Sequence, residues 1–231
     1  MSSRTETLAS RVVARFAEQL RAIPAVAGDV AFEVGAADLR SVCRVLRDDP
    51  QFGFEQLIDV SGVDYLDYGR DEWRTLAATA SGFSRGVNRI RETVGESRPA
   101  RFAVSYQLLS IANNWRLRLR SFTSEGEPPV VDSVVEIWAS ANWYERETFD
   151  MYGILFKDHP DLRRLLTDYG FIGHPFRKDF PLIGNVEVKY DPAKGRVVYQ
   201  PVSIEPRTLV PRVIRDDNRY EAALKDAPKN G

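Results

Sequence analysis

The sequence is poor in the residues that hold metal ions and redox centres. Its 231 residues include one cysteine, Cys43, and two histidines, His159 and His174. One cysteine cannot form an internal disulfide, and it cannot supply the four thiolates that an iron–sulfur cluster usually needs. Cys43 lies at helical spacing among apolar residues, so we expect a small core residue rather than a reactive thiol.

Common cofactor motifs are missing as well. There is no Gly-x-Gly-x-x-Gly pattern after an expected strand, no Gly-Lys-Ser/Thr phosphate loop and no Cys-x-x-Cys pair. These absences argue against a bound dinucleotide, a phosphate loop and a zinc ribbon. We therefore expect no catalytic, cofactor-binding or metal-binding residue in this chain.

An excess of one charge and a long apolar run are also lacking. The chain has 32 Lys and Arg against 33 Asp and Glu, so no overall field favours nucleic acid. No run approaches the roughly 20 apolar residues of a membrane helix. The arginine-rich start could belong to a transit peptide, but Glu6 and Glu18 interrupt it and apolar residues recur at helical spacing. We expect a folded first helix and a cytoplasmic protein without a cleaved signal.

The first part of the chain mixes helical and strand patterns, which predicts an α+β domain with a mixed sheet and packed helices. The expected elements are a helix over 5–22, a strand over 30–34, a helix from Asp38 to before Pro50, a strand over 54–60, a polar turn-rich segment over 61–70, and a hairpin with strands over 102–108 and 115–120.

Two arginine-rich regions allow two interpretations each. Arg116, Arg118 and Arg120 alternate with apolar residues, so they form one face of the second hairpin strand. Segment 69–100 is irregular and also rich in arginine. Each region is either a solvated surface or a contact surface for a partner, and the solvated interpretation is the more common one.

Two capping patterns follow Pro128-Pro129. The box Ser133-Val-Val-Glu136 predicts a short helix over 133–139, and a second box from Asn142 to Glu145 predicts a helix over 142–152 that Gly153 ends.

The second of these helices is dense in charges and aromatic rings. Arg146 and Asp150 are i, i+4 partners on it. Glu145 and Glu147 could form a catalytic carboxylate pair, but i, i+2 residues point to nearly opposite sides of a helix. A structural ion-pair network at an interface core therefore fits these residues better.

Beyond residue 153 the composition shifts toward proline. Only 186–190 and 196–200 form a regular unit there, an expected short hairpin. The apolar residues of this stretch have no periodicity for a core of their own, so they need another surface to cover them. We predict an N-terminal domain over 1–153, an extended partner-binding segment over 154–215 and a polar tail over 216–231.

Both histidines precede prolines in one block with several acidic residues. A metal-dependent or acid–base hydrolase could use His159 and His174 together with these acids. However, His159-Pro160 and His174-Pro175 lack the i, i+4 spacing of a helical histidine pair. Each imidazole more plausibly fixes a loop by hydrogen bonds or contacts a neighbouring subunit.

Three parts of the sequence carry long, specific motifs: 142–166 (NWYERETFDMYGILFKDHPDLRRLL), 169–182 (YGFIGHPFRKDFPL) and, upstream, 54–60 with 63–65. Together they resemble one known family, the C subunit of NADH–quinone oxidoreductase. The resemblance spans roughly 5–215, while residues 69–100, particularly 81–98, depart from it by their length and their arginines. No sequence of the quinone-site subunit, which some members carry as a fusion, is joined to this chain.

The resemblance implies a non-catalytic scaffold without flavin or cluster. Such a protein packs an α+β domain and lays a long proline-rich C-terminal segment over the quinone-site D subunit, with the cluster-bearing B, I and G subunits as further neighbours. FMN and iron–sulfur clusters belong to partner subunits, and the assembly transfers electrons from NADH to quinone and pumps protons. It would lie peripherally at the cytoplasmic side of a bacterial inner membrane, or at the matrix side in mitochondria. The equivalent subunit of a membrane-bound hydrogenase or a related dehydrogenase is the alternative.

Carried onto this sequence, the resemblance marks a set of family and interface residues. They are Trp143, Glu145, Arg146, Glu147, Asp150, His159, Arg163, Arg164, His174, Phe176, Arg177, Lys178 and Asp179.

Overall fold

A computed structural model describes residues 3–24, 28–66, 68 and 100–204 of the chain. The chain divides into two compact units, one formed by 1–66 and 96–182 and the other by 67–95 and 183–231. The expected polar tail over 216–231 and nearly all of the arginine-rich segment 69–100 lie outside the described residues.

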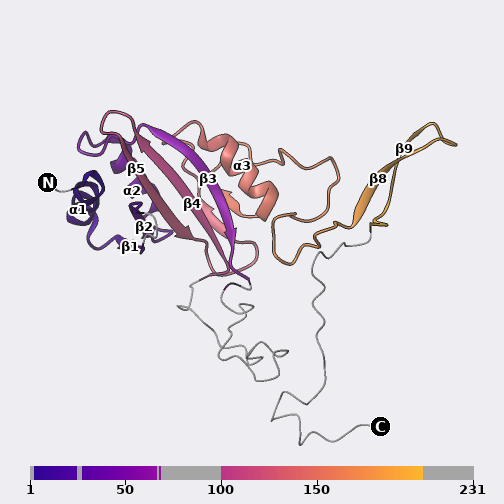
Figure 1. The fold of residues 1–231 in the computed structure, drawn as a ribbon, viewed down its shortest axis with the longest axis horizontal. Coiled ribbons are helices and arrows are strands. Elements are labelled where there is room, and N and C mark those ends of the chain that lie inside the picture. Colours follow the sequence, from indigo (N-terminus) through magenta and orange to yellow (C-terminus); the bar gives the residue numbers. More distant parts are fainter. Residues whose placement is uncertain (1–2, 25–27, 67, 69–99, 205–231) are drawn as a thin grey trace, which may run out of the picture. The chain divides into compact units, whose positions relative to one another are not determined.

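The first unit is built on a five-stranded mixed sheet, with the strand order β1-β2-β5-β4-β3 (Figure 1). All neighbouring strands are antiparallel except β2 and β5, which are parallel. The strands are β1 (Leu20–Ala22), β2 (Ala31–Val34), β3 (Gln56–Asp64), β4 (Phe102–Ser110) and β5 (Trp115–Phe122). Together with its helices this sheet confirms the predicted α+β class.

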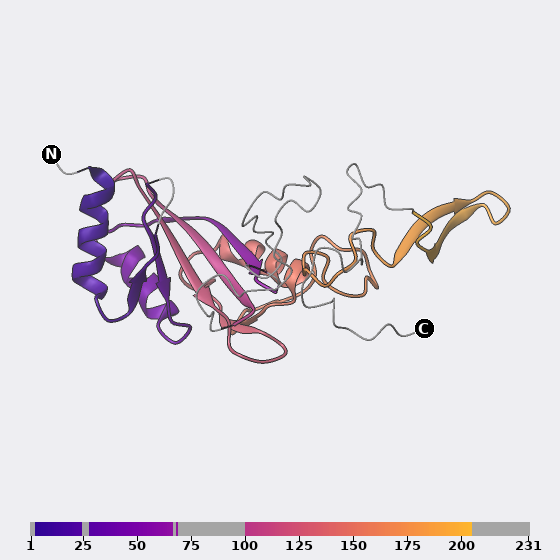
Figure 2. The ribbon, with the colours of Figure 1, turned by 60° about the horizontal axis from the view of Figure 1, so that its bottom comes forward.

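Two amphipathic helices supply much of the core beside this sheet. In α1 (Arg4–Phe16), a capping box between Ser3 and Glu6 satisfies the first backbone donors. In α2 (Leu39–Asp48), Asp38 is the N-cap residue but its side chain makes no capping hydrogen bond, and Cys43 is free and buried as expected. Figure 2 shows both helices at one end of the sheet. Their buried stripes join alternate residues of β4 and β5 in one apolar cluster.

The opposite face of the sheet is polar. Ser105 and Gln107 of β4 and the three arginines of β5 alternate with the core residues there. Arg118 pairs with Asp29 at 3.7 Å and Arg120 pairs with Glu33 at 2.6 Å. Two of the three arginines thus have acidic partners within the chain, which supports the solvated interpretation of this row.

Helix α3 (Ala141–Tyr152) lies along β3 (Figure 1). The prediction that Gly153 ends this helix is confirmed, because Gly153 has a φ of 73° and its N–H donates to the carbonyl of Phe149. This left-handed conformation favours glycine. The N-cap position belongs to Ser140, so the predicted capping box from Asn142 to Glu145 is wrong.

Three further expectations differ from the structure. The first helix ends at Phe16, and Leu20–Ala22 forms β1, because its backbone finds partners in β2. Strand β3 continues to Asp64, since 61–64 pairs with β4. The predicted helix over 133–139 is a set of turns. The parallel pair β6 (Val130–Asp132) and β7 (Leu155–Lys157) was not foreseen.

The second unit contains the predicted hairpin, formed by β8 (Val186–Asp191) and β9 (Arg196–Pro201). The register places Val188 opposite Tyr199 and Tyr190 opposite Val197. One face of the hairpin is therefore apolar, and the large side chains on it are 56–64% exposed. In the part of the chain that the structure describes, no helix is long and apolar enough to cross a membrane.

Candidate functional site

Buried charges gather on α3, which makes this helix the candidate site. Glu145 and Asp150 are fully buried, and Arg146 is nearly so. Charged side chains are almost never buried unless they are paired or hydrogen-bonded. The partners of these three residues therefore define what the helix does.

The carboxylate of Asp150 organises the loop that follows β7. It accepts hydrogen bonds from the backbone N–H groups of Leu165, Leu166 and Thr167 at 3.0, 2.7 and 2.9 Å. The Thr167 hydroxyl donates at 2.6 Å and Arg164 Nη1 at 3.2 Å. Burial alone would raise the pKa of Asp150, but these hydrogen bonds outweigh it and lower the pKa to about 2.

The last carbonyls of α3 hold the next stretch of chain. The carbonyl of Asp150 accepts from His174 Nδ1 at 2.8 Å, and that of Tyr152 accepts from Arg177 Nε at 2.6 Å. Between them, the carbonyl of Met151 accepts from the N–H of Phe176 at 3.0 Å. The final carbonyls of a helix have no partner within the helix itself. Here the segment 174–177 supplies those partners.

Two glycines allow this close packing. A Cβ atom on Gly153 would lie 2.6 Å from the ring of His174 and 2.7 Å from Arg177 Nη2. A Cβ atom on Gly62 of β3 would lie 2.5 Å from the ring of Tyr152. Both positions therefore require glycine for steric reasons, and they bring β3, α3 and segment 174–177 into direct contact.

Asp64, at the end of β3, anchors the same segment from its other side. Arg101 donates to both of its carboxylate oxygens at 2.8 and 2.6 Å, and the N–H of Lys178 donates at 2.9 Å. Arg101 also pairs with Asp179 at 3.0 Å. Burial would raise the pKa of Asp64, but the hydrogen bonds from Arg101 and from the backbone of Lys178 and Leu66 lower it overall. The sequence did not identify Asp64 or Arg101 as site residues, because Asp64 fell in an expected turn.

Glu145 has a different environment from Asp150. Its carboxyl group accepts from the Ser133 hydroxyl at 2.6 Å and from the N–H of Val134 at 2.7 Å. His159 Nε2 lies 4.0 Å away. Burial raises the pKa of Glu145 to about 7, although the hydrogen bonds from Ser133 and Val134 oppose the shift.

Arg146 does not form the predicted pair with Asp150. Its guanidinium lies over the ring of Trp143, 5.1 Å from the centroid, and Nε donates to the carbonyl of Arg163 at 3.2 Å. The cation beside Asp150 is Arg164 instead. Arg146 therefore fixes the loop through stacking and a backbone contact rather than through a carboxylate.

The predicted family residues fall into two groups. One group is engaged in the internal contacts described above: Glu145, Arg146, Asp150, His159, Arg164, His174 and Arg177. The other group is exposed to solvent: Trp143, Glu147, Arg163, Phe176, Lys178 and Asp179. The first group holds the loop in place, and the second group lies on the surface of α3 and the loop, where Trp143 and Asp179 also contact Arg146 and Arg101.

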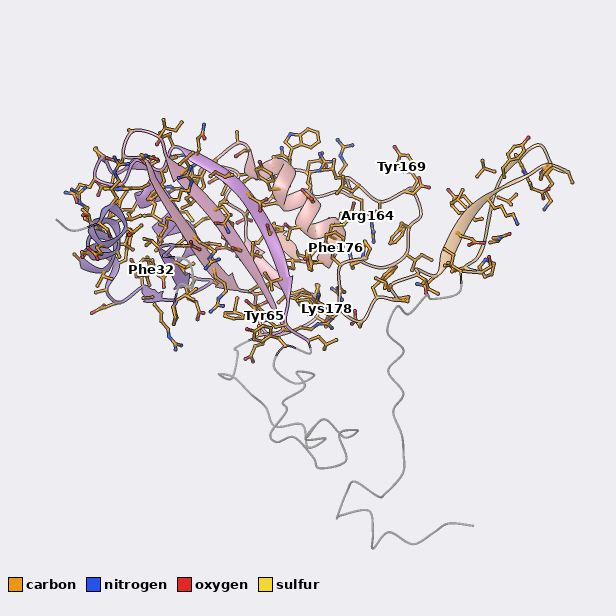
Figure 3. The ribbon with its side chains drawn as sticks, in the orientation of Figure 1. Phe32, Tyr65, Arg164, Tyr169, Phe176 and Lys178 are labelled. Atoms are coloured by element: carbon orange, nitrogen blue, oxygen red, sulfur yellow. The ribbon has the colours of Figure 1, made fainter. Side chains whose placement is uncertain are left out.

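The loop also exposes large apolar side chains that the sequence did not single out. They are Leu166, Tyr169, Ile172 and Leu182, of which Tyr169 and Leu182 are fully exposed. Figure 3 shows Arg164 and Phe176 near the end of α3 and Tyr169 on the outer bend of the loop. We call this set, together with Trp143 and Phe176, the apolar loop surface.

Metal ligands and nucleophile patterns bear on whether this chain has chemistry of its own. Among the residues that the structure describes, no group of three or more His, Cys, Asp and Glu side chains could hold a metal ion. The sequence also contains Gly82-Phe-Ser-Arg-Gly86, a spacing that can form a nucleophile elbow between a strand and a helix. That pattern lies outside the described residues.

Comparison with known proteins places these features in one family. Residues 32–186 match the family described as respiratory-chain NADH dehydrogenase, 30 Kd subunit. The C subunit of NADH-quinone oxidoreductase from Coxiella burnetii is 56% identical over 222 residues, which cover 96% of this chain and 97% of that protein. The protein of the same name from Halorhodospira halophila is 58% identical over 210 residues, covering 86% and 85%. That of Xanthomonas euvesicatoria is 50% identical and covers 100% and 98%.

A solved structure shares the fold at much lower identity. It is the membrane-bound sulfane sulfur reductase, an archaeal respiratory membrane complex. The match has a TM-score of 0.55 and 16% identity, and it covers 78% of this chain and 88% of that chain. At this identity the likeness concerns the fold alone.

Proposed function

This chain belongs to the family of the respiratory-chain NADH dehydrogenase 30 Kd subunit, and on that premise we propose that it is a non-catalytic scaffold subunit of a proton-pumping NADH–quinone oxidoreductase. The similar proteins from Coxiella, Halorhodospira and Xanthomonas, which carry that enzyme's name along nearly the whole chain, support this assignment. The sulfane sulfur reductase shares the fold at 16% identity, which does not favour the alternative of a related membrane-bound complex.

The observation that carries the proposal is a rigidly held loop with an apolar surface. The loop over 164–179 is irregular, yet Asp150, Asp64 and the last carbonyls of α3 fix its backbone. A fixed loop that exposes Tyr169 and Phe176 presents an apolar patch to its surroundings. Such patches mark contact sites for other proteins.

We propose that the quinone-site D subunit covers this apolar surface of the loop, with the B, I and G subunits as further neighbours. FMN and iron–sulfur clusters would belong to these and other partner subunits. Electron transfer to quinone needs its donor cluster and its binding cavity in fixed geometry, because small displacements in such sites cost rate heavily. A scaffold subunit supports that geometry without chemistry of its own, on the cytoplasmic or matrix side of the membrane.

A pair of substitutions on exposed apolar residues tests the role of the loop. Tyr169→Arg should lower the amount of assembled complex, because a charge would replace a fully exposed ring in the apolar loop surface. Ile111→Arg is the matched control, since Ile111 is also exposed but lies in the turn between β4 and β5. Both variants should fold as isolated chains.

The measurement is affinity purification of the tagged full chain from membranes, followed by native gels and mass spectrometry of the partners. We expect recovery of the partners to fall at least about tenfold for Tyr169→Arg, which corresponds to about 1.4 kcal/mol, and to stay unchanged for Ile111→Arg. Equal recovery for both variants would remove the loop from the interface. Partners from a different enzyme would reject the NADH–quinone assignment.

A further inference from the structure

Glu145 and His159 are buried side by side in the first unit, and the scaffold role does not account for them. The side chains of both residues are inaccessible to solvent, and His159 Nε2 lies 4.0 Å from Glu145 Oε2. Glu145 has only a hydroxyl and one backbone N–H as hydrogen-bond donors among the described residues. An ionised carboxylate at such a place is costly unless a cation faces it.

The surroundings of His159 fix its protonation state. The N–H of Asp161 donates to His159 Nδ1 at 3.0 Å, so Nδ1 must be free of a proton. Nε2 lies 3.3 Å from the carbonyl of Asn142, which only accepts, so Nε2 must carry the proton. The imidazole is therefore neutral in this arrangement and does not act as a cation toward Glu145.

Within the described ranges, the other groups around the pair do not supply that cation at contact distance. Arg40 of α2 points its guanidinium to the carbonyl of Ser133 at 3.0 Å and to the carboxylate of Asp158 at 3.0 Å. The titratable and charged groups that face the pair are Arg40 and Cys43 of α2, Tyr106 of β4, Arg146 of α3, and Asp161. Cys43 and Tyr106 are neutral at ordinary pH, because burial raises the pKa of each.

We propose that Glu145 and His159 form a proton-sensitive switch, in which the Glu145 carboxyl group takes up a proton near neutral pH and protonation of His159 opens the turn from His159 to Asp161. When Glu145 carries the proton, its carboxyl group donates to the Ser133 hydroxyl oxygen. When Glu145 is ionised, the serine donates instead, and the separation of 2.6 Å suits both cases.

The order of the two proton uptakes follows from burial. Burial raises the pKa of Glu145 to about 7, and burial lowers the pKa of His159 below its usual value. As the pH falls, Glu145 therefore takes its proton first and His159 takes one later. A proton on Nδ1 of His159 would face the N–H of Asp161, so the turn loses its hydrogen bond only in the second step.

Nuclear magnetic resonance of the full chain with ¹⁵N-labelled histidine tests the switch, because the chain has only two imidazoles. His174 is an internal control, since its Nδ1 faces the carbonyl of Asp150 at 2.8 Å and must carry the proton. We expect opposite tautomers at neutral pH, with the proton on Nε2 in His159 and on Nδ1 in His174. The variants His159→Gln and His174→Gln assign the signals.

The second part of the proposal, protonation of Glu145, is followed through its side-chain carboxyl carbon. Through-bond correlation to the backbone amide of Glu145 assigns that signal. It should titrate near the raised pKa of about 7, and the Asp161 amide signal should move only when His159 becomes protonated. No variant is needed for this measurement. A doubly protonated His159 at neutral pH, or a Glu145 carboxyl group that titrates near 4.5 as an ordinary glutamate does, would overturn the proposal.

Discussion

Asp150 and Glu145 are both fully buried acids of α3, and their surroundings give them opposite protonation behaviour. Asp150 faces a ring of donors that favour the charged form, whereas Glu145 has two donors and no cation at contact distance among the described residues. The pKa of Asp150 is lowered to about 2 and that of Glu145 is raised to about 7. The first acid holds its charge to fix a loop, and the second one is a site of proton uptake.

Asp150→Asn should destabilise the full chain by about 3–5 kcal/mol, because Arg164 and three backbone donors would lose their anionic partner. The stabilisation from the charged form is present above the usual aspartate pKa and is lost as the pH falls toward about 2. Urea unfolding near neutral pH measures the difference. Asp161→Asn is the control, since Asp161 forms an exposed pair with Arg163 and should change the stability by less than about 1 kcal/mol. Similar effects for both variants would contradict this role of Asp150.

Glu145→Gln should change how stability depends on pH. The folded state binds a proton on Glu145 up to about pH 7, whereas the unfolded chain releases it near 4.5. Stability from this group is therefore complete below 4.5 and falls as the pH rises to about 7, by about 3 kcal/mol at about 1.4 kcal/mol per pH unit. The glutamine variant lacks this loss, so its stability relative to the parent should increase across that range. A free energy of unfolding that changes with pH in the same way in the variant and the parent would contradict this prediction.

The sequence predicted which residues matter on α3 better than it predicted how they pair. Helical spacing suggested that Arg146 is the cation of Asp150, because i, i+4 neighbours are the only pairs that a local pattern reveals. The structure pairs Asp150 with Arg164, which lies beyond β7. Pairing across a loop depends on the tertiary path of the chain, so spacing along the sequence could not show it.

At the scale of the elements, β3 and α3 pack closely because Gly62 leaves room for the ring of Tyr152. An added Cβ atom would lie 2.5 Å from that ring, closer than real Cβ contacts. Gly62→Ala should therefore destabilise the chain by about 1–3 kcal/mol through overpacking. The substitution Gly35→Ala is the control, since its nearest neighbour would be an Asp38 oxygen at 3.7 Å.

A double-mutant cycle separates the steric effect of Gly62→Ala from a backbone effect. Tyr152→Ala removes the ring, so adding Gly62→Ala to that background should cost clearly less than it does alone. Thermal unfolding of the four chains gives the coupling. If the free-energy effects of the two substitutions are additive, contact between residue 62 and the ring of Tyr152 is not the cause of the destabilisation.

The elements that the sequence missed are the short ones. Strands β1, β6 and β7 contain three residues each, which is too few to show an alternating pattern. The predicted helix over 133–139 had a capping box, but the Ser133 hydroxyl bonds to Glu145, and tertiary contact replaces the local cap. The long elements, with several turns or residues of periodic pattern, were predicted with the correct type.

At the scale of the whole molecule, the second unit has an apolar surface but little core in its described residues. A single two-stranded hairpin is marginally stable in water. Val186, Val188, Tyr190, Val197 and Tyr199 lie on one face, while Glu187, Lys189 and Gln200 lie on the other. We propose that the apolar face of β8 and β9 is covered by a partner subunit, as expected for the predicted partner-binding segment over 154–215.

Replacing a valine with glutamate on each face of the hairpin, in the full chain, tests whether a partner subunit covers the apolar face. Val188→Glu places a carboxylate on the apolar face, opposite Tyr199, and should lower recovery of the partner subunits at least about tenfold. Val198→Glu places the same group on the polar face, opposite Lys189, where a cross-strand ion pair is mildly favourable. Both substitutions leave the first unit unchanged. The free energy of unfolding of each isolated variant chain should therefore equal that of the parent chain. Because the residue exchange is identical, a loss of partners confined to Val188→Glu assigns the apolar face to the interface, whereas equal recovery for both would show that it remains in solvent.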